Sequence, residues 1–430
     1  MACAGTDNGR TDIQSTQTIL CINTGSSSIK FHLYEMGPPV LAPGLPGPGL
    51  ASLSALPARP CRYEELLAKG AVEGAGQEEG RLWFADAQGE VLADKQLVRV
   101  GQEEAVLEAL AVLSASNLPS IEAIGHRVVH GGPERFAPER VTQELLDYLR
   151  AHSAWAPLHI PVSLRVMEAL RRERPDLPQV ACFDTAFHVL MPEVARRLPL
   201  PRRFYDQGVY KYGFHGLSYE YLLSVLGERA LGRLIMAHLG NGASMVACRD
   251  GVAVDTTMGM TPIGGIVMGT RPGDLDPGVL LYLLRDQGFD LESLEKLLNK
   301  ESGLRGVSGQ TSDMHILLER SAQGDRGAAL AVNMFAYTAR KAVGALAAVL
   351  GGLDCLVFSG GIGENAAVVR ALICEGLQHL GLELDADKNK AGEKIISTDD
   401  SRCLAMVIPT NEEIVIARHT FALVFGSESS

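Results

Sequence analysis

Two arginines occupy glycine-rich segments that carry little other charge. Arg127 lies in Gly125-His126-Arg127-Val128-Val129-His130-Gly131-Gly132, and Arg271 lies in Met268-Gly269-Thr270-Arg271-Pro272-Gly273-Asp274. A guanidinium is planar and permanently charged, so it binds a carboxylate or phosphate through paired hydrogen bonds. One such arginine is more often paired with a buried acid for structural reasons. Two of them, beside glycines that allow close approach, favour a pocket for an anion.

Three segments rich in glycine and serine follow apolar runs. They are Asn23-Thr24-Gly25-Ser26-Ser27-Ser28, Gly240-Asn241-Gly242-Ala243-Ser244 and Gly360-Gly361-Ile362-Gly363-Glu364-Asn365, and the apolar runs before them are 19–22, 234–237 and 356–358. Glycines let backbone N–H groups approach an anion, and serine hydroxyls add further donors. Three such loops spread along the chain predict a nucleotide phosphate site between two related halves.

A histidine and two carboxylates complete the candidate chemistry. His215 lies between glycines in Tyr212-Gly213-Phe214-His215-Gly216, where an imidazole could donate a hydrogen bond to charge that develops on a phosphoryl group in transfer. Asp184 ends a predicted strand, and Glu412 opens a predicted helix after another strand. Both are natural ligands of Mg²⁺. Both could instead cap helices, and spacing alone does not choose between these roles.

Length and composition limit the alternatives. A chain of 430 residues is longer than one hydrophobic core usually serves, so we expect two domains. A formal charge of −12 argues against nucleic-acid binding, which needs a basic surface. The eight cysteines form no CxxC pair, and several lie in apolar runs, which favours reduced, buried thiols. No segment has the composition of a secretory signal or a membrane helix, so we expect a cytoplasmic protein.

The elements that must position these residues follow an α/β pattern. We predict two strands within 19–34, further strands at 121–129, 180–183, 234–238, 244–248, 252–255, 356–358 and 406–409, and helices at 103–113, 145–151, 161–172, 277–286, 291–299, 327–350 and 367–376, with a last helix after 413. The strand–turn–strand unit of residues 19–34 recurs at 234–250. This weak self-similarity has the form of a duplicated nucleotide-binding domain.

Taken together, these segments resemble the acetate kinase family, of the acetate and sugar kinase/Hsp70/actin superfamily. Ten motifs occur in the family's order across nearly the whole chain, at 23–31, 126–132, 156–159, 183–188, 212–216, 238–242, 268–271, 302–304, 361–365 and 410–413. The resemblance implies two duplicated actin-like (ribonuclease H-like) domains, with mixed sheets flanked by helices and a nucleotide cleft between them. It implies an N-terminal domain of 18–185 plus 413–430, a C-terminal domain of 186–412, and a homodimer. From their polar composition, we expect residues 1–17 to be a disordered leader.

The same resemblance implies Mg²⁺-dependent, reversible, in-line transfer of the ATP γ-phosphate to acetate, which yields acetyl phosphate and ADP. Mn²⁺ would be able to replace Mg²⁺. The implied catalytic residues are Arg127, His159, Asp184, His215, Asn241 and Arg271, and the implied metal site is Asn23, Asp184 and Glu412. Arg127 would bind the substrate with an apolar pocket of Val129, Leu158, Phe214 and Pro262. The implied nucleotide site is Asn23, Ser26, Ser28, Lys30, His238, Gly240, Asn241, Gly242, Asp313, Met314, His315, Gly361, Ile362, Gly363 and Asn365.

The chain departs from the family pattern at three places. Ile160 stands where the family usually has asparagine, Leu217-Ser218-Tyr219 where it has threonine, serine and histidine, and His315 where it has an arginine near the nucleotide. Alternatives therefore remain: a propionate or butyrate kinase of the same fold, a pyrophosphate-using enzyme, or a non-catalytic actin-like nucleotide-binding protein. One methylene changes binding by only about 1–3 kcal/mol, so the sequence does not decide the chain length of the substrate. Neither does it decide the physiological direction or the role of residues 37–60.

Overall fold

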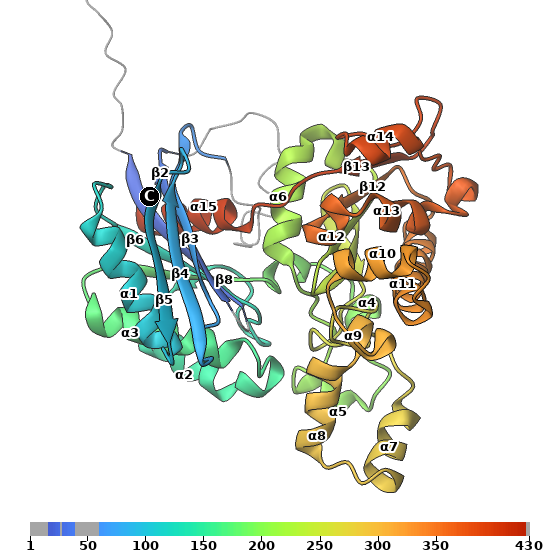
Figure 1. Ribbon diagram of the computed structural model, residues 1–430, viewed down its shortest axis with the longest axis horizontal. Helices are drawn as coiled ribbons and strands as arrows, with labels where there is room; N and C mark the ends of the chain where they lie inside the picture. The colour runs from blue at the N-terminus through green and yellow to red at the C-terminus, as the bar shows by residue number, and fades with distance from the viewer. Residues whose placement is uncertain (1–15, 26–27, 39–59, 427–430) are drawn as a thin grey trace, which may run out of the picture.

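The computed structural model describes residues 16–25, 28–38 and 60–426. Most of the predicted leader, most of the Pro/Gly-rich segment 37–60, and Ser26 lie outside these ranges. Within them, no helix is long and apolar enough to cross a membrane. The chain forms two α/β parts, each built on one sheet (Figure 1).

The first sheet has eight strands in the order β5-β4-β3-β2-β1-β6-β8-β7. Its strands are β1 (Gln17–Thr24), β2 (Ser28–Met36), β3 (Glu64–Glu73), β4 (Glu79–Asp86), β5 (Val91–Val98), β6 (Ala123–Val128), β7 (Glu139–Arg140) and β8 (Gln179–Phe183). The central strand β1 runs antiparallel to β2 and parallel to β6, which is in turn parallel to β8. Parallel strands are normally covered on both faces, and the burial of β1 along nearly its whole length fits this.

Helices cover the two faces of this sheet, and alternation along β1 decides which residues each face receives. Leu20 and Ile22 pack into a cluster with α1 (Gln102–Ala115) and α3 (Ile160–Glu173). Ile19 and Cys21 point to the other face and pack with the last helix, α15 (Glu412–Val424). Figure 1 shows α15, in red, beside the blue strands, so the end of the chain returns to the part where the chain began.

The second sheet has five strands in the order β11-β10-β9-β12-β13. They are β9 (Arg233–Leu239), β10 (Ala243–Arg249), β11 (Val252–Thr256), β12 (Cys355–Ser359) and β13 (Leu404–Val407). Ile235 and Ala237 pack in one cluster with residues of the long helix α11 (Arg326–Leu350), and Leu234 and Met236 pack in another with residues of α6 (Gly216–Leu226).

The two sheets share one topology. In each, the first strand is central, the second and third strands extend one side in antiparallel order, and two parallel strands extend the other side. In the second sheet, β10 and β11 take the places of β2 and β3, and β12 and β13 take those of β6 and β8. This correspondence confirms the predicted pair of duplicated actin-like domains with mixed sheets.

The remaining elements connect and cover these sheets. The longer helices are α2 (Gln143–Ala151), α7 (Pro277–Asp286), α10 (Met314–Ala322) and α13 (Ala367–Cys374). The short ones are α4 (Glu193–Arg196), α5 (Arg202–Asp206), α8 (Leu291–Lys296), α9 (Gly303–Ser308), α12 (Gly360–Asn365) and α14 (Ala386–Ala391). Figure 1 shows α7 and α8 projecting from the body of the second part.

One prediction about an element was wrong, and three strands were not predicted. Residues 64–98 form β3, β4 and β5, which the sequence patterns did not indicate, and they widen the first sheet. The third glycine-rich segment is the short helix α12 rather than a loop. Gly360 makes the turn from β12 into α12 with φ of 75°, and a methyl group there would lie 2.8 Å from the Leu239 carbonyl oxygen. Only glycine combines this backbone angle with so close an approach to β9.

Candidate active site

Three of the predicted site residues lie at the carboxyl ends of neighbouring parallel strands. Asn23 is near the end of β1, Arg127 is near the end of β6, and Asp184 directly follows β8. Parallel strands end at the same edge of a sheet, which is where α/β proteins bind ligands. The fourth residue, Glu412, begins α15 and is brought to the same edge by the packing of that helix on β1 and β6.

Arg127 is the centre of this group. Its Nη2 lies 2.6 Å from Asp184 Oδ2, and its Nε lies 3.1 Å from each Asp184 oxygen. Its Nη1 donates to Asn23 Oδ1 at 3.1 Å and lies 3.4 Å from Glu412 Oε2. Asn23 Nδ2 in turn donates to Glu412 Oε2 and to Glu413 Oε1, each at 3.0 Å. The structure therefore brings the predicted metal ligands together around one guanidinium.

These charges are buried and determine one another's titration. Burial lowers the pKa of Arg127, but the charges of Asp184 and Glu412 raise it by more than burial lowers it. The overall shift is therefore upward, and the arginine stays charged. Burial raises the pKa of Glu412, but the charge of Arg127 and the neighbouring His238 outweigh it, so the overall shift is downward and Glu412 is ionised. Burial raises the pKa of Asp184 against the opposing pull of Arg127.

The donor set fits Mg²⁺, which proteins bind through one or two carboxylates while water and phosphate complete the octahedron. Asp184 is fully buried, and the Glu412 side chain is 8% exposed. Both carboxylates belong to one group around Arg127, and their oxygens are the ligands that Mg²⁺ prefers. No group of three or more His, Cys, Asp or Glu side chains in metal-binding arrangement occurs within the described ranges. A metal at this edge would therefore need ligands from its substrate.

Arg271 lies beside this group but has no acid of its own. Its Nη1 donates to the Pro262 carbonyl oxygen, and among residues 60–426 and the described N-terminal stretches no carboxylate pairs with it. Burial, followed by the charge of Arg127, lowers the pKa of Arg271 to about 10. Arg127 and Arg271 lie close together, and the described acids pair only with Arg127. The charge of Arg271 can therefore attract an anion.

His215 faces Arg271 across Gly242. A methyl group on Gly242 would lie 2.6 Å from Arg271 Nη2 and 3.3 Å from His215 Nε2. His215 precedes α6 and has left-handed backbone angles, with φ of 58°, which are strained for a residue with a side chain. Burial, and then the neighbouring His238 and Arg127, hold its pKa well below the usual value, so the imidazole is neutral.

His159 approaches both arginines from the start of α3. Burial, with the charges of Arg271 and Arg127, lowers its pKa to about 3. Its Nδ1 is buried and has no hydrogen-bond partner among the described residues. A buried polar atom without a partner is costly, and it points to a group that binds there.

Each of the four residues of the predicted apolar pocket is close in the chain to a residue of the charged site or hydrogen-bonds to one. Val129 directly follows the end of β6, two positions after Arg127, while Leu158 precedes His159 and Phe214 precedes His215. Pro262 carries the carbonyl that Arg271 binds. Val129 and Phe214 are almost completely buried. The rings of Phe214 and His130 lie 5.4 Å apart, and His130 Nε2 contacts the Met260 carbonyl oxygen at 3.1 Å, which ties the segment after β6 to the Pro262 loop.

The turn between β9 and β10 carries several residues of the predicted nucleotide site. Gly240 donates its N–H to the Gly242 carbonyl oxygen at 3.0 Å, and Asn241 accepts from the Gly269 N–H through its carbonyl oxygen at 3.0 Å. A methyl group on Gly269 would lie 2.0 Å from Asn241 Oδ1, so only glycine leaves room for the Asn241 side chain. The His238 ring, at the end of β9, stacks on His215 with centroids 4.3 Å apart.

The other predicted nucleotide residues lie on separate elements. Ser28 and Lys30 are on β2, where Lys30 is exposed, and Ser26 is outside the described residues. Asp313 caps α10 by accepting from the His315 and Ile316 N–H groups. Met314 and Ile362 pack against the same hydrophobic cluster. His315 is exposed and lies 3.6 Å from Glu319, while Gly361, Gly363 and Asn365 belong to α12.

Two residues that the sequence patterns did not single out hold α12 in place. Glu364 Oε1 accepts from the Gly360 N–H at 2.9 Å and from the Thr410 N–H at 3.0 Å, which links α12 to the segment that leads to Glu412. Arg370 is 1% exposed and donates to the Gly363 and Glu364 carbonyl oxygens at 2.9 and 2.8 Å. An arginine within a predicted helix is an ordinary surface residue by sequence, so nothing marked it.

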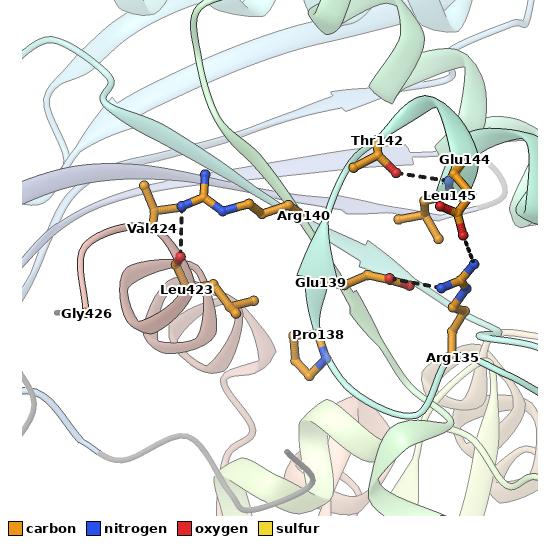
Figure 2. A pocket seen from close by; sticks show the side chains of 10 residues that line it. All are labelled: Arg135, Pro138, Glu139, Arg140, Thr142, Glu144, Leu145, Leu423, Val424 and Gly426. Carbon is orange, nitrogen blue, oxygen red and sulfur yellow. Dashed lines mark hydrogen bonds and ion pairs between the residues drawn. The ribbon is translucent and has the colours of Figure 1, made fainter. Parts of the chain in front are cut away.

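A hollow of about 680 Å³ lies elsewhere, between β7 and the end of α15 (Figure 2). Arg140 donates to the Leu423 carbonyl oxygen across it, and Arg135 pairs with Glu139 and Glu144 on its other side. None of the predicted site residues lines this hollow. Its arginines are already bound to acids or carbonyl oxygens, unlike Arg271.

Comparison with known proteins bears directly on this arrangement. A sequence model of the acetokinase family matches residues 18–418. An acetate kinase of Methylocella silvestris is 43% identical over 420 residues, which cover 95% of this chain and 98% of the relative. An acetate kinase of Rhodopseudomonas palustris is 41% identical over 420 residues, which cover 96% and 99%.

Solved structures give the same result. The propionate kinase of Francisella tularensis superposes with a TM-score of 0.83 at 35% identity, and the acetate kinase of Porphyromonas gingivalis with 0.79 at 35%. Both alignments cover 95% of this chain and all of the other. The match spans both sheets and every segment that contributes to the charged site. The chain therefore belongs to the acetokinase family.

Proposed function

We propose that this protein catalyses reversible transfer of the γ-phosphoryl group of ATP to acetate, with acetyl phosphate and ADP as products. The observation that carries the proposal is Arg271, a partly buried cation that pairs with no acid among the described residues. It lies beside Arg127 and faces His215 across Gly242. An actin-like module that only binds nucleotide would have no use for such a cation, whereas a carboxylate substrate would neutralise it.

The chemistry requires alignment and charge compensation more than covalent help. Acetate is ionised at pH 7, so its oxygen attacks the γ-phosphorus without a base, and the bond to the bridging oxygen breaks with its electrons leaving on ADP. Arg271 and Arg127 would orient the carboxylate, and His215 would donate a hydrogen bond to the phosphoryl oxygens. Asn241, next to Gly242 in the chain, and His159, beside both arginines, would assist.

The metal site that we propose consists of Asp184 and Glu412, with Asn23 beside them. Mg²⁺, or Mn²⁺ in its place, would supply positive charge against the β- and γ-phosphates when bound there. Arg127 contacts both carboxylates, so the residues that hold the metal and the residue that binds the substrate belong to one hydrogen-bonded group.

Acetate is the first candidate acceptor, and propionate is the second. The pocket that we propose for the alkyl group consists of Val129, Leu158, Phe214 and Pro262. The Francisella tularensis relative of similar fold is a propionate kinase, which is the observation that keeps the longer substrate open. The nucleotide would be bound by the residues between β9 and β10 and by α12. The exposed position of His315, in place of an arginine, is the reason to test pyrophosphate as an alternative donor.

The finer organisation is also a proposal. Domains of 18–185 plus 413–430 and of 186–412 agree with the return of α15 to the first sheet. A homodimer is supported by α7 and α8, where Leu281, Tyr282 and Leu291 are more than half exposed. A cytoplasmic location is supported by the seven described cysteines, which are all buried and unpaired.

Hydroxylamine trapping tests the central proposal. The purified protein is incubated with ATP, Mg²⁺ and either acetate, propionate or butyrate, and the acyl hydroxamate is measured. We expect hydroxamate from acetate, at a rate that falls with chain length. A higher rate with propionate would reassign the substrate within the family. ATP binding without hydroxamate from any of the three acids would refute the kinase proposal.

A further inference from the structure

A chain of hydroxyl groups leads from the protein interior to His215. The Ser244 Oγ lies 2.8 Å from His215 Nδ1 and 2.5 Å from the Tyr219 phenol oxygen. Tyr219 is on the first turn of α6, and its side chain is completely buried, as is that of Ser244. Tyr219 is also one of the residues at which this chain departs from the family pattern, since a histidine is expected there.

The direction of these hydrogen bonds follows from counting donors and acceptors. The phenol of Tyr219 carries one proton, and its burial raises its pKa, so the phenol keeps that proton. Among the described residues, Ser244 is the acceptor within reach of that proton.

If Tyr219 donates to Ser244, the single hydroxyl proton of Ser244 is left to donate to His215 Nδ1. The opposite tautomer would have Nδ1–H donate to Ser244. Ser244 could then donate to Tyr219, which leaves the buried phenol proton without an acceptor, or accept from Tyr219 as well, which leaves its own proton without an acceptor among the described residues. Either arrangement is costly inside a protein. The assignment is therefore Tyr219 to Ser244, and Ser244 to His215.

We propose that Tyr219 and Ser244 are positioning residues that hold His215 in the tautomer with its proton on Nε2. The Nε2 atom is the one that faces Gly242 and Arg271. A proton there lets the neutral imidazole donate to an anionic phosphoryl oxygen, whereas the other tautomer would present a lone pair to it. The catalytic consequence rests on the proposed function, but the tautomer itself does not.

Tyr219 suits this task better than a histidine would. A histidine at this position could donate or accept through either nitrogen, so it would leave the direction of the chain open. A protonated phenol always carries one proton to donate, and Ser244 is the acceptor that the described residues place within its reach. In this protein, the tautomer of His215 is therefore fixed by a phenol that must donate its proton.

The tautomer is measured directly by two-bond ¹H–¹⁵N correlation spectra of protein labelled in its histidines, with the His215 signal assigned by its loss in His215→Gln. We expect the Nε2–H tautomer in the unaltered protein and a mixture of both tautomers in Tyr219→Phe and Ser244→Ala. The control is Tyr221→Phe, which removes a phenol from the same helix outside this chain of hydrogen bonds and should leave the spectrum unchanged. The Nδ1–H tautomer in the unaltered protein would overturn the proposal.

Kinetics provide the second measurement. We expect Tyr219→Phe and Ser244→Ala each to lower kcat about tenfold to hundredfold with little change in either KM. Because both act through one relay, the double variant should be no slower than Ser244→Ala alone. Additive effects, or loss of stability without loss of kcat, would show that these hydroxyls are only structural. An inactive unaltered protein that retains the Nε2–H tautomer would refute the proposed function and leave this inference standing.

Discussion

Arg127 pairs with Asp184 through two of its three guanidinium nitrogens: Nη2 lies 2.6 Å from Oδ2, and Nε contacts both carboxylate oxygens. The two residues lie on neighbouring parallel strands, 57 positions apart in the chain. Arg271, by contrast, donates to a backbone carbonyl oxygen. The two arginines of the site therefore differ in what their removal leaves behind.

Arg127→Ala and Arg271→Ala should both lose activity, but only the first should lose stability. Removing Arg127 leaves Asp184 and Glu412 buried without their cation, which costs about 3–5 kcal/mol in the free energy of unfolding. Removing Arg271 leaves no described carboxylate without its partner. The stability of Arg271→Ala should therefore be unchanged or higher, while its turnover falls about 100-fold or more. Urea unfolding and the hydroxamate assay measure the two effects. Equal destabilisation by both substitutions would contradict the assignment.

Stability should fall as the pH drops from about 6.5 towards 4. Burial lowers the pKa of His126, His130 and His188, each to about 4. A histidine with a depressed pKa binds more protons when unfolded, so its contribution is complete above pH 6.5 and is lost on acidification. Each contributes about 1.4 kcal/mol per pH unit in that range. Unfolding free energies at pH 7, 6 and 5 test this slope. His126→Gln should reduce the slope by the share of one histidine, about 1.4 kcal/mol per pH unit.

Gly242→Ala should slow turnover without harming the fold. The added methyl group would lie 2.6 Å from Arg271 Nη2 and must displace the guanidinium. A shift of this size costs about tenfold to hundredfold in kcat. Gly344→Ala is the matched control, since a methyl group there meets nothing within 4 Å and lies within α11. The control should keep full activity and gain about 0.5–1 kcal/mol in stability. Full activity in Gly242→Ala would place Arg271 outside the reaction.

Arg370→Lys should weaken nucleotide binding selectively. Arg370 binds the Gly363, Glu364 and Asn389 oxygens with its planar fork, and lysine cannot reproduce that geometry. If α12 holds the nucleotide, KM for ATP should rise several-fold while KM for acetate stays constant. Arg340→Lys, at a partly exposed arginine of α11, should change neither value. A rise in both constants would indicate a general loss of structure instead.

Leu281→Asp should convert a dimer into monomers. Leu281 is 56% exposed on α7, next to other exposed apolar side chains on α7 and α8. A charge at the centre of an apolar interface is strongly unfavourable because it loses its hydration without gaining a partner. Light scattering measures the mass of each protein. Val194→Asp, at an isolated exposed valine on α4, should remain dimeric. A monomeric unaltered protein would refute the interface.

Much of the fold could be predicted from local sequence patterns. The strand pairs at β1–β2 and β9–β10 and the helices α1, α3, α7 and α11 follow from apolar periodicity bounded by turn residues, because those signals act over a few positions. The repeat of the strand–turn–strand unit indicated the duplication. The strands β3, β4 and β5 were missed because their stability comes from pairing along the edge of a sheet, which a short window of sequence does not contain.

The sequence by itself determined which residue types were available: arginines beside glycines, a histidine between glycines, and carboxylates at the ends of strands. Only the tertiary structure decided how they share their hydrogen bonds. It pairs Asp184 and Glu412 with Arg127, places no described carboxylate against Arg271, and buries Tyr219 and Ser244 behind His215. These contacts join residues that are distant in the chain. Their partners, burial and proton positions arise from the packing of two sheets and α15, not from any local preference.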